Sequence, residues 1–129
     1  MQKNGILNRD IAGILAKLGH TDEIVIADCG LPIPDDVLCI DVSLRLGYPD
    51  FAEIFKLLMK EMQVEGLVAA EESSTSNSKV TQIIEHQQLF LTYIPHELFK
   101  ERTRKAKVII RTGENTPYAN VILQAGVIF

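Results

Sequence analysis

The chain has 129 residues, with 17 acidic and 13 basic side chains and a formal net charge of −4 at pH 7. This length predicts a single domain over residues 1–129 that can bury a core without disulfides. The sequence has no basic block, no apolar leader and no apolar run long enough for a membrane span. We therefore expect a cytoplasmic protein with no nucleic-acid partner and no membrane insertion.

The first half of the chain predicts alternating helices and strands. Asn8 can cap a helix through its side-chain oxygen, and Gly19 is expected to end that helix with a positive φ. The run from Ile24 has no polar alternation, so its strand is predicted to be covered on both faces. The expected elements are a helix over 11–18, strands over 24–28 and 37–42, and an amphipathic helix over 51–62.

The second half continues the alternation. The serine- and threonine-rich stretch 73–78 is interpreted as a loop. The expected elements are strands over 66–70, 89–94, 108–110 and 121–123, and helices over 80–87 and 96–102. The apolar segment 125–129 is expected either to close the sheet or to pack against another subunit. This order predicts an α/β fold, a three-layer α/β/α arrangement with a largely parallel sheet that can be mixed at its C-terminal edge.

Three polar residues flank the predicted strands. Asp28 closes the first strand and His96 follows the fourth, and ligands of open α/β sheets bind beyond the carboxyl ends of strands. His20 lies in the loop before the first strand and can share a site with Asp28 if that loop folds back over the sheet. A histidine suits acid–base chemistry near neutral pH, but loop histidines and turn aspartates are often only structural. His86 is interpreted as solvent-exposed.

The polar stretch 111–120 separates two apolar strands and has two interpretations. It is either a plain surface loop or a recognition loop for a polyol, because its hydroxyl, amide and phenol groups can both donate and accept hydrogen bonds. Tyr118 and Asn120 would suit a sugar, which offers an apolar ring face and hydroxyl edges.

Metal and phosphate chemistry have little support in the sequence. His20, Asp28 and His96 lack the close spacing of familiar metal-ligand motifs, and no glycine-rich phosphate loop is present. Cys29 is interpreted as a small buried hydrophobe, because the neighbouring carboxylate would disfavour its thiolate. No cofactor and no metal are expected.

Several long blocks of the sequence carry a family resemblance. These blocks are 4–8 (NGILN), 19–34 (GHTDEIVIADCGLPIP), 109–114 (IIRTGE) and 116–129 (TPYANVILQAGVIF). Together they resemble the RbsD/FucU family of sugar mutarotases over essentially the whole chain, most weakly at 72–92. The resemblance implies an α/β fold and ring-shaped homo-oligomers, by family resemblance a decamer. It also implies a pocket where the C-terminal segment of one subunit meets its neighbour.

The resemblance implies roles for particular residues. His20, in the GHTD block, is the expected proton donor. Asp28, in the IADCG block, is expected to hold the sugar or to bias His20 toward its protonated form. Further sugar contacts are implied for His96, Tyr118, Ala119 through its backbone, and Asn120.

The implied activity is the interconversion of the pyranose and furanose forms of D-ribose, which supplies the furanose to ribokinase. Ring opening needs a proton delivered to the ring oxygen and another removed from the anomeric hydroxyl, and reclosure through a different hydroxyl changes the ring size. No cofactor is required. Two alternatives stay open: a non-enzymatic sugar-binding accessory of a ribose transporter, and a mutarotase for another sugar such as L-fucose.

Overall fold

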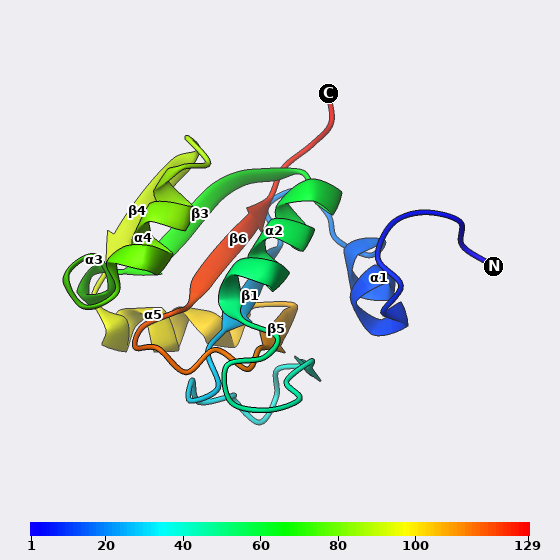
Figure 1. The fold of residues 1–129 in the computed structure, drawn as a ribbon. Coiled ribbons are helices and arrows are strands. Elements are labelled where there is room, and N and C mark those ends of the chain that lie inside the picture. The colour runs from blue at the N-terminus through cyan, green and yellow to red at the C-terminus, as the bar shows by residue number, and fades with distance from the viewer.

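Six strands form one sheet in the computed structural model, which describes residues 1–129 (Figure 1). The strands are β1 (Glu23–Ala27), β2 (Cys39–Asp41), β3 (Val64–Ala70), β4 (Phe90–Ile94), β5 (Val108–Arg111) and β6 (Val121–Ala125). Their order across the sheet is β2-β5-β1-β6-β3-β4. Only β6 runs antiparallel to its neighbours, β1 and β3, and the remaining pairs are parallel.

The expected α/β class and largely parallel sheet are confirmed, but the antiparallel strand lies in the middle of the sheet rather than at its edge. A parallel neighbour needs a long crossover, usually helical. The connection 112–120 contains no helix, and the chain returns through it in the opposite direction. The start of β6 therefore lies at the edge where the five parallel strands end, which we call the carboxyl edge. The opposite edge is the amino edge.

Helices cover both faces of the sheet. They are α1 (Arg9–Leu15), α2 (Phe51–Glu61), α3 (Glu71–Ser76), α4 (Ser78–Glu85) and α5 (His96–Arg102), which a short 3-10 helix, η1 (Thr103–Lys105), follows. Side chains of α1, α2 and α4 pack on the face that carries Ile24 and Ile26. Phe99 of α5 packs on the other face, which carries Val25 and Ala27. Alternate residues of β1 are thus buried on opposite faces, as its unbroken apolar run predicted.

The first helix begins as expected and ends early. The Asn8 side chain accepts hydrogen bonds from the backbone N–H groups of Asp10 and Ile11, both at 3.0 Å. The helix ends at Leu15, and the expectation that Gly19 stops it with a positive φ is wrong. Instead, the Asp22 carboxylate accepts from the Gly19 backbone N–H at 2.8 Å. The positive φ falls two residues later.

The stretch 73–78, interpreted as a loop, is mostly helical: residues 73–76 lie in α3, Asn77 separates the two helices, and Ser78 begins α4. The hydroxyls of Ser73, Ser74 and Thr75 each donate to the backbone carbonyl three residues earlier. The Thr81 hydroxyl donates to the Ser73 carbonyl at 3.0 Å. Because these polar side chains find partners along the helix itself, their low apolar content does not prevent helix formation.

The C-terminal segment does not close the sheet. The backbone N–H of Gly126 donates to the Gln63 carbonyl at 2.9 Å, and the chain then leaves the sheet (Figure 1). Ile128 and Phe129 are 90% and 99% exposed. Packing of this segment against another subunit remains a prediction. None of the helices is both long and apolar enough to cross a bilayer.

Candidate functional site

Five of the six predicted site residues meet at the carboxyl edge. Asp28 follows β1, His96 opens α5 directly after β4, and residues 118–120 lead into β6. Because β6 is antiparallel, its start lies beside the ends of its neighbours, and this topology brings the three segments together. We call these residues the carboxyl-edge cluster: Asp28, His96, Tyr118, Ala119 and Asn120.

Hydrogen bonds lock Asp28 to Asn120. The Asn120 side-chain amide donates to Asp28 Oδ2 at 2.9 Å, and its carbonyl oxygen accepts from the Asp28 backbone N–H at 2.8 Å. Asp28 Oδ1 accepts from the Gly30 backbone N–H at 2.9 Å. Asp28 is therefore a turn-capping aspartate and a member of the cluster at the same time. Asn120 is 1% exposed, so its orientation is fixed by packing as well as by these bonds.

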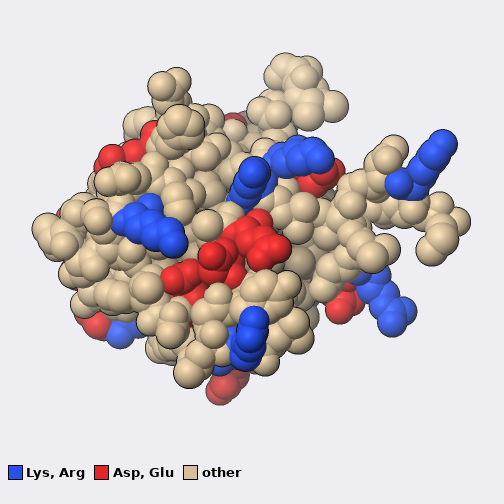
Figure 2. All heavy atoms as spheres, viewed as in Figure 1, with Lys and Arg blue, Asp and Glu red and all other residues tan.

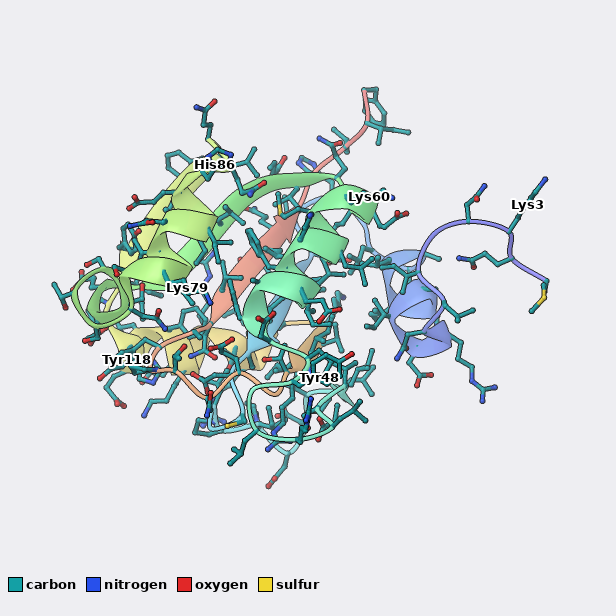
Figure 3. The ribbon with its side chains drawn as sticks, in the orientation of Figure 1. Lys3, Tyr48, Lys60, Lys79, His86 and Tyr118 are labelled. Atoms are coloured by element: carbon teal, nitrogen blue, oxygen red, sulfur yellow. The ribbon has the colours of Figure 1, made fainter.

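The rings of His96 and Tyr118 lie in contact at the same edge. Their centroids are 5.0 Å apart and their planes meet at 80°, an edge-to-face arrangement. Tyr118 has a φ of 54°, in the left-handed region that bulky residues rarely adopt. Figure 3 shows Tyr118 at the lower left, where α5 lies, and His86 apart from it at the upper left. His86 is exposed, as interpreted from the sequence.

The surroundings of His96 determine which of its ring nitrogens can serve a ligand. The Glu72 carboxylate accepts from the His96 backbone N–H at 3.0 and 3.2 Å. Nδ1 of the His96 ring is buried and has no hydrogen-bond partner. A buried N–H without an acceptor is costly, so between the two tautomers the one with its proton on Nε2 is favoured. Nε2–H is then the group that His96 can offer to a hydroxyl.

The polar connection before β6 is held by buried partners. Asn77, which is buried, donates through its side-chain amide to the Thr116 hydroxyl and to the Pro117 carbonyl, both at 2.8 Å. Glu114 accepts from the Phe51 backbone N–H at 2.9 Å and from the Thr116 hydroxyl at 2.6 Å. The sequence singled out neither Asn77 nor Glu114, although both fix the path that leads to Tyr118.

Arg111 supports the turn that carries Asp28. Its guanidinium donates to the Cys29 carbonyl at 3.1 and 3.3 Å and to the Asp41 carboxylate at 2.9 Å. Burial alone would raise the pKa of Asp41, but hydrogen bonds from Ser43 and Arg111 outweigh it and lower that pKa. Asp41 thus stays ionised and keeps Arg111 in place beneath the turn.

His20 lies at the amino edge, away from the cluster. It precedes β1 whereas Asp28 follows it, and a five-residue strand spans about 17 Å. The loop does not fold back over the sheet, because the backbone N–H of Thr21 donates to the Ala125 carbonyl at 2.9 Å. Within one chain His20 therefore does not join Asp28, and Asp28 cannot bias its protonation there.

The side chain that does meet His20 is Glu65. His20 Nε2 lies 2.9 Å from Glu65 Oε2 and 3.1 Å from Oε1. The two side chains are 51% and 38% exposed. The sequence did not identify Glu65 as a site residue. The only feature that could have pointed to it is its carboxylate, which interrupts the otherwise apolar run 64–70.

The larger surface hollows do not coincide with the candidate site residues. Surface hollows of about 750, 740 and 480 Å³ are lined by neither the cluster nor His20. No group of three His, Cys, Asp or Glu side chains is placed to hold a metal ion. Figure 2 shows isolated lysines and arginines beside a group of acidic side chains, without a continuous basic surface on that face.

Comparison with known proteins gives consistent matches over the whole chain. Residues 1–128 match the model of the RbsD / FucU transport protein family. The chain is 60% identical, over the full length of both, to a protein of Halalkalibacterium halodurans named D-ribose pyranase. Among solved structures, Bacillus subtilis RbsD complexed with D-ribose matches with a TM-score of 0.98 and 53% identity, over 100% of both chains. A fucose mutarotase from Streptococcus pneumoniae in complex with L-fucose matches less closely, with a TM-score of 0.78 and 28% identity over 95% of each chain.

Proposed function

The chain belongs to the RbsD/FucU family, and from that membership we propose that it is an isomerase that interconverts the pyranose and furanose forms of D-ribose. The observation that carries this function is the full-length match, at 60% identity, to a D-ribose pyranase. The higher similarity to the ribose-bound structure than to the fucose-bound one favours D-ribose as the substrate. In this proposal the furanose product is the substrate of a sugar kinase. The reaction is proposed to take place in the cytoplasm.

In this proposal His20 is the general acid. It delivers a proton to the ring oxygen of the sugar while the anomeric hydroxyl loses one, and the ring opens to the aldehyde. Reclosure through another hydroxyl gives the other ring size. A positioned acid or base typically contributes about 10²–10⁴-fold to such a step. The reaction requires no cofactor, because only the hemiacetal bond forms and breaks.

The carboxyl-edge cluster is proposed to hold the sugar. The Asp28 carboxylate can accept from hydroxyls, and Nε2–H of His96 can donate to one. The Tyr118 ring offers a flat surface for the apolar face of the sugar, and the backbone of Ala119 and the amide of Asn120 complete the polar rim. The rigid support of Asn120 and Tyr118 favours this role, because fixed polar groups bind without first being ordered.

We further propose that each pocket is completed by a second copy of the chain. His20 and the cluster lie at opposite edges of the sheet, so one chain cannot present both to the same sugar. A neighbouring copy that places its amino edge against this carboxyl edge would bring them together. The exposed Ile128 and Phe129, which extend from the amino edge, give such a contact an apolar anchor. By family membership the assembly is proposed to be a ring-shaped homo-oligomer, a decamer.

Magnetisation-transfer NMR on D-ribose tests the activity directly. Catalytic amounts of the protein should speed exchange between pyranose and furanose signals, and L-fucose in a parallel sample should respond less. Binding without acceleration would leave only the role of a sugar-binding accessory. Faster exchange of L-fucose than of D-ribose would instead assign the protein to the other sugar.

A further inference from the structure

A β-bulge in β3 aims Glu65 at His20. Val64 pairs with Ala125 of β6 and Gly66 pairs with Gln124, with a shift of register between them. Glu65 is therefore an extra residue without a partner on β6, and it is the one exposed position of an otherwise buried strand. Bulges redirect side chains and are frequent beside active sites. Without the bulge, the alternation of the strand would direct the side chain at this position differently.

The end of β6 leaves room for this carboxylate. A Cβ atom on Gly126 would lie 3.0 Å from Glu65 Cβ and 3.4 Å from the Glu65 backbone nitrogen. Any larger residue at 126 would press on the bulge and move the Glu65 side chain. The Gly126 backbone N–H also donates to the Gln63 carbonyl at 2.9 Å, which fixes the two segments against each other.

The His20 loop is held just as firmly and in a strained conformation. Thr21 has a φ of 71°, which is rare for a β-branched residue because of steric conflict with its own backbone. Two backbone hydrogen bonds maintain it, from Thr21 N–H to the Ala125 carbonyl at 2.9 Å and from Ala125 N–H to the Asp22 carbonyl at 2.8 Å. Strain of this kind persists only where the surroundings impose it, and it gathers at functional sites.

We propose that Glu65 is a positioning residue that fixes the ring of His20 and selects Nδ1 as its proton-transferring atom; this rests on the proposed role of His20 as the acid. A carboxylate accepts hydrogen bonds and does not donate them, so the 2.9 Å contact requires the proton on Nε2. With Nε2–H committed to Glu65, Nδ1 is the nitrogen left to face the sugar of a neighbouring copy. Other charged groups nearby are Asp22, whose carboxylate accepts from the Gly19 N–H, and Lys107, which lies 3.6 Å from Asp22.

The proton balance of the reaction follows from this geometry. The protonated ring of His20 gives its Nδ1 proton to the ring oxygen as the bond between that oxygen and C1 breaks and its electron pair moves to oxygen. The anomeric hydroxyl releases its proton to water, and C1 becomes the aldehyde carbon. On reclosure the attacking hydroxyl returns a proton to Nδ1, and the carbonyl oxygen takes one from water. Throughout, the Nε2 proton stays with Glu65.

The test compares Glu65→Gln with Glu53→Gln, which removes the same charge from an exposed side chain on α2. An amide can donate as well as accept, so Glu65→Gln no longer selects one tautomer of His20. We expect its kcat for ribose exchange to fall about tenfold to a hundredfold, as for other partners that orient a functional histidine. Its KM should stay near the parent value, because Glu65 does not touch the sugar, and Glu53→Gln should match the parent protein in both.

A spectroscopic readout keeps this inference separate from the activity itself. Magic-angle-spinning NMR of protein with ring-¹⁵N-labelled histidine reports the tautomer without sugar and does not depend on particle size. The His20 signals are assigned by their loss in His20→Ala. In the neutral ring, which His20 has after it gives up its Nδ1 proton and which is measured at alkaline pH, we expect the Nε2–H tautomer in the parent and a mixture in Glu65→Gln. An Nδ1–H tautomer in the parent would overturn the role of Glu65. The same holds if Glu65→Gln leaves both the His20 tautomer and kcat unchanged. A parent protein with the expected tautomer but no ribose exchange would reject the proposed function instead.

Discussion

The side chain of Asn120 makes two hydrogen bonds to Asp28 at once, one to its carboxylate at 2.9 Å and one from its backbone N–H at 2.8 Å. This pair joins the end of β1 to the start of β6, two strands whose residues stand far apart in the sequence. It orients the carboxylate proposed to bind the sugar, and it does so from a side chain that is almost completely buried.

Replacing Asn120 by Asp should therefore cost both stability and sugar affinity. The substitution keeps the shape, removes the amide donor and sets two carboxylates against each other. Loss of a buried partner typically lowers the free energy of unfolding by about 1–3 kcal/mol. Urea unfolding and ribose titration measure the two effects. Asn115→Asp, a matched change at an exposed position of the same connection, should alter neither. An Asn120→Asp protein as stable as Asn115→Asp would contradict the importance of the pair.

His20→Ala should lose catalysis without losing stability. The exposed side chain contributes little packing, and exposed ion pairs such as the one with Glu65 contribute on the order of 0–1 kcal/mol. Its exchange rate should fall by about 10²–10⁴-fold, the typical contribution of a general acid. Magnetisation-transfer NMR and thermal unfolding are the two measurements, with His86→Ala as the control for removing an exposed histidine. Full activity of His20→Ala would disprove the assignment, and unfolding would point to a structural role.

Mixed oligomers should test whether two copies share each pocket. His20→Ala and His96→Ala should each be nearly inactive alone. After dissociation, mixing and reassembly, about a quarter of the pockets would pair an intact His20 with an intact His96 from the other chain. Recovery of activity toward that fraction supports the shared pocket. Light scattering must first show an oligomer, and labelled subunits must be seen to exchange. No recovery despite exchange, or a monomer in solution, would mean that the pocket is not shared.

The alkaline limit of stability should depend on Tyr93. Its hydroxyl donates to the Glu85 carboxylate at 2.8 Å and so ties β4 to the end of α4. Burial, together with this carboxylate, raises the pKa of Tyr93 to about 12. An unfolded tyrosine titrates near pH 10, so this contribution is complete below about pH 10 and is lost as the pH rises toward about 12.

Tyrosinate absorbance during an alkaline titration measures this shift. The parent protein should show a tyrosine ionisation step near pH 12, from Tyr93. Tyr93→Phe should remove that late step, whereas Tyr48→Phe, a change at an exposed ring, should leave it in place. A parent protein without an ionisation step near pH 12 would show that the contact with Glu85 has no effect.

Features decided by neighbouring residues were predictable from the sequence. The cap at Asn8 depends on residues two and three positions away, and Phe51, Phe55 and Leu58 recur at helical spacing along one buried face of α2. The cluster at the carboxyl edge was also expected, because Asp28 and His96 each follow a strand. Its assembly needed one further fact, the antiparallel course of β6, which brings residues 118–120 to the same edge.

Features decided by distant pairing were not predictable. The central position of β6 depends on its pairing with β1 and β3. Local sequence patterns do not indicate which strands pair with each other. The bulge at Glu65 arises from a shift of register in the pairing of β3 with β6, which the sequence of β3 alone does not show. The separation of His20 from Asp28 depends on the hydrogen bonds that Thr21 and Asp22 make to Ala125. The end of α3 at 73–76 was missed for a local reason, because hydroxyl groups that usually favour loops donate here to carbonyls of the preceding turn.

The position of β6 also constrains how the protein can be made in the cell. β6 is the last of the six strands along the chain, yet it lies between β1 and β3. During synthesis, the units β2-β5-β1 and β3-β4 have no strand that joins them until β6 has been made. Until then β1 and β3 each present an unpaired edge, the kind of surface through which nascent chains aggregate. The sheet can therefore be completed only after β6 has left the ribosome, and chaperones that shield strand edges would act before that point.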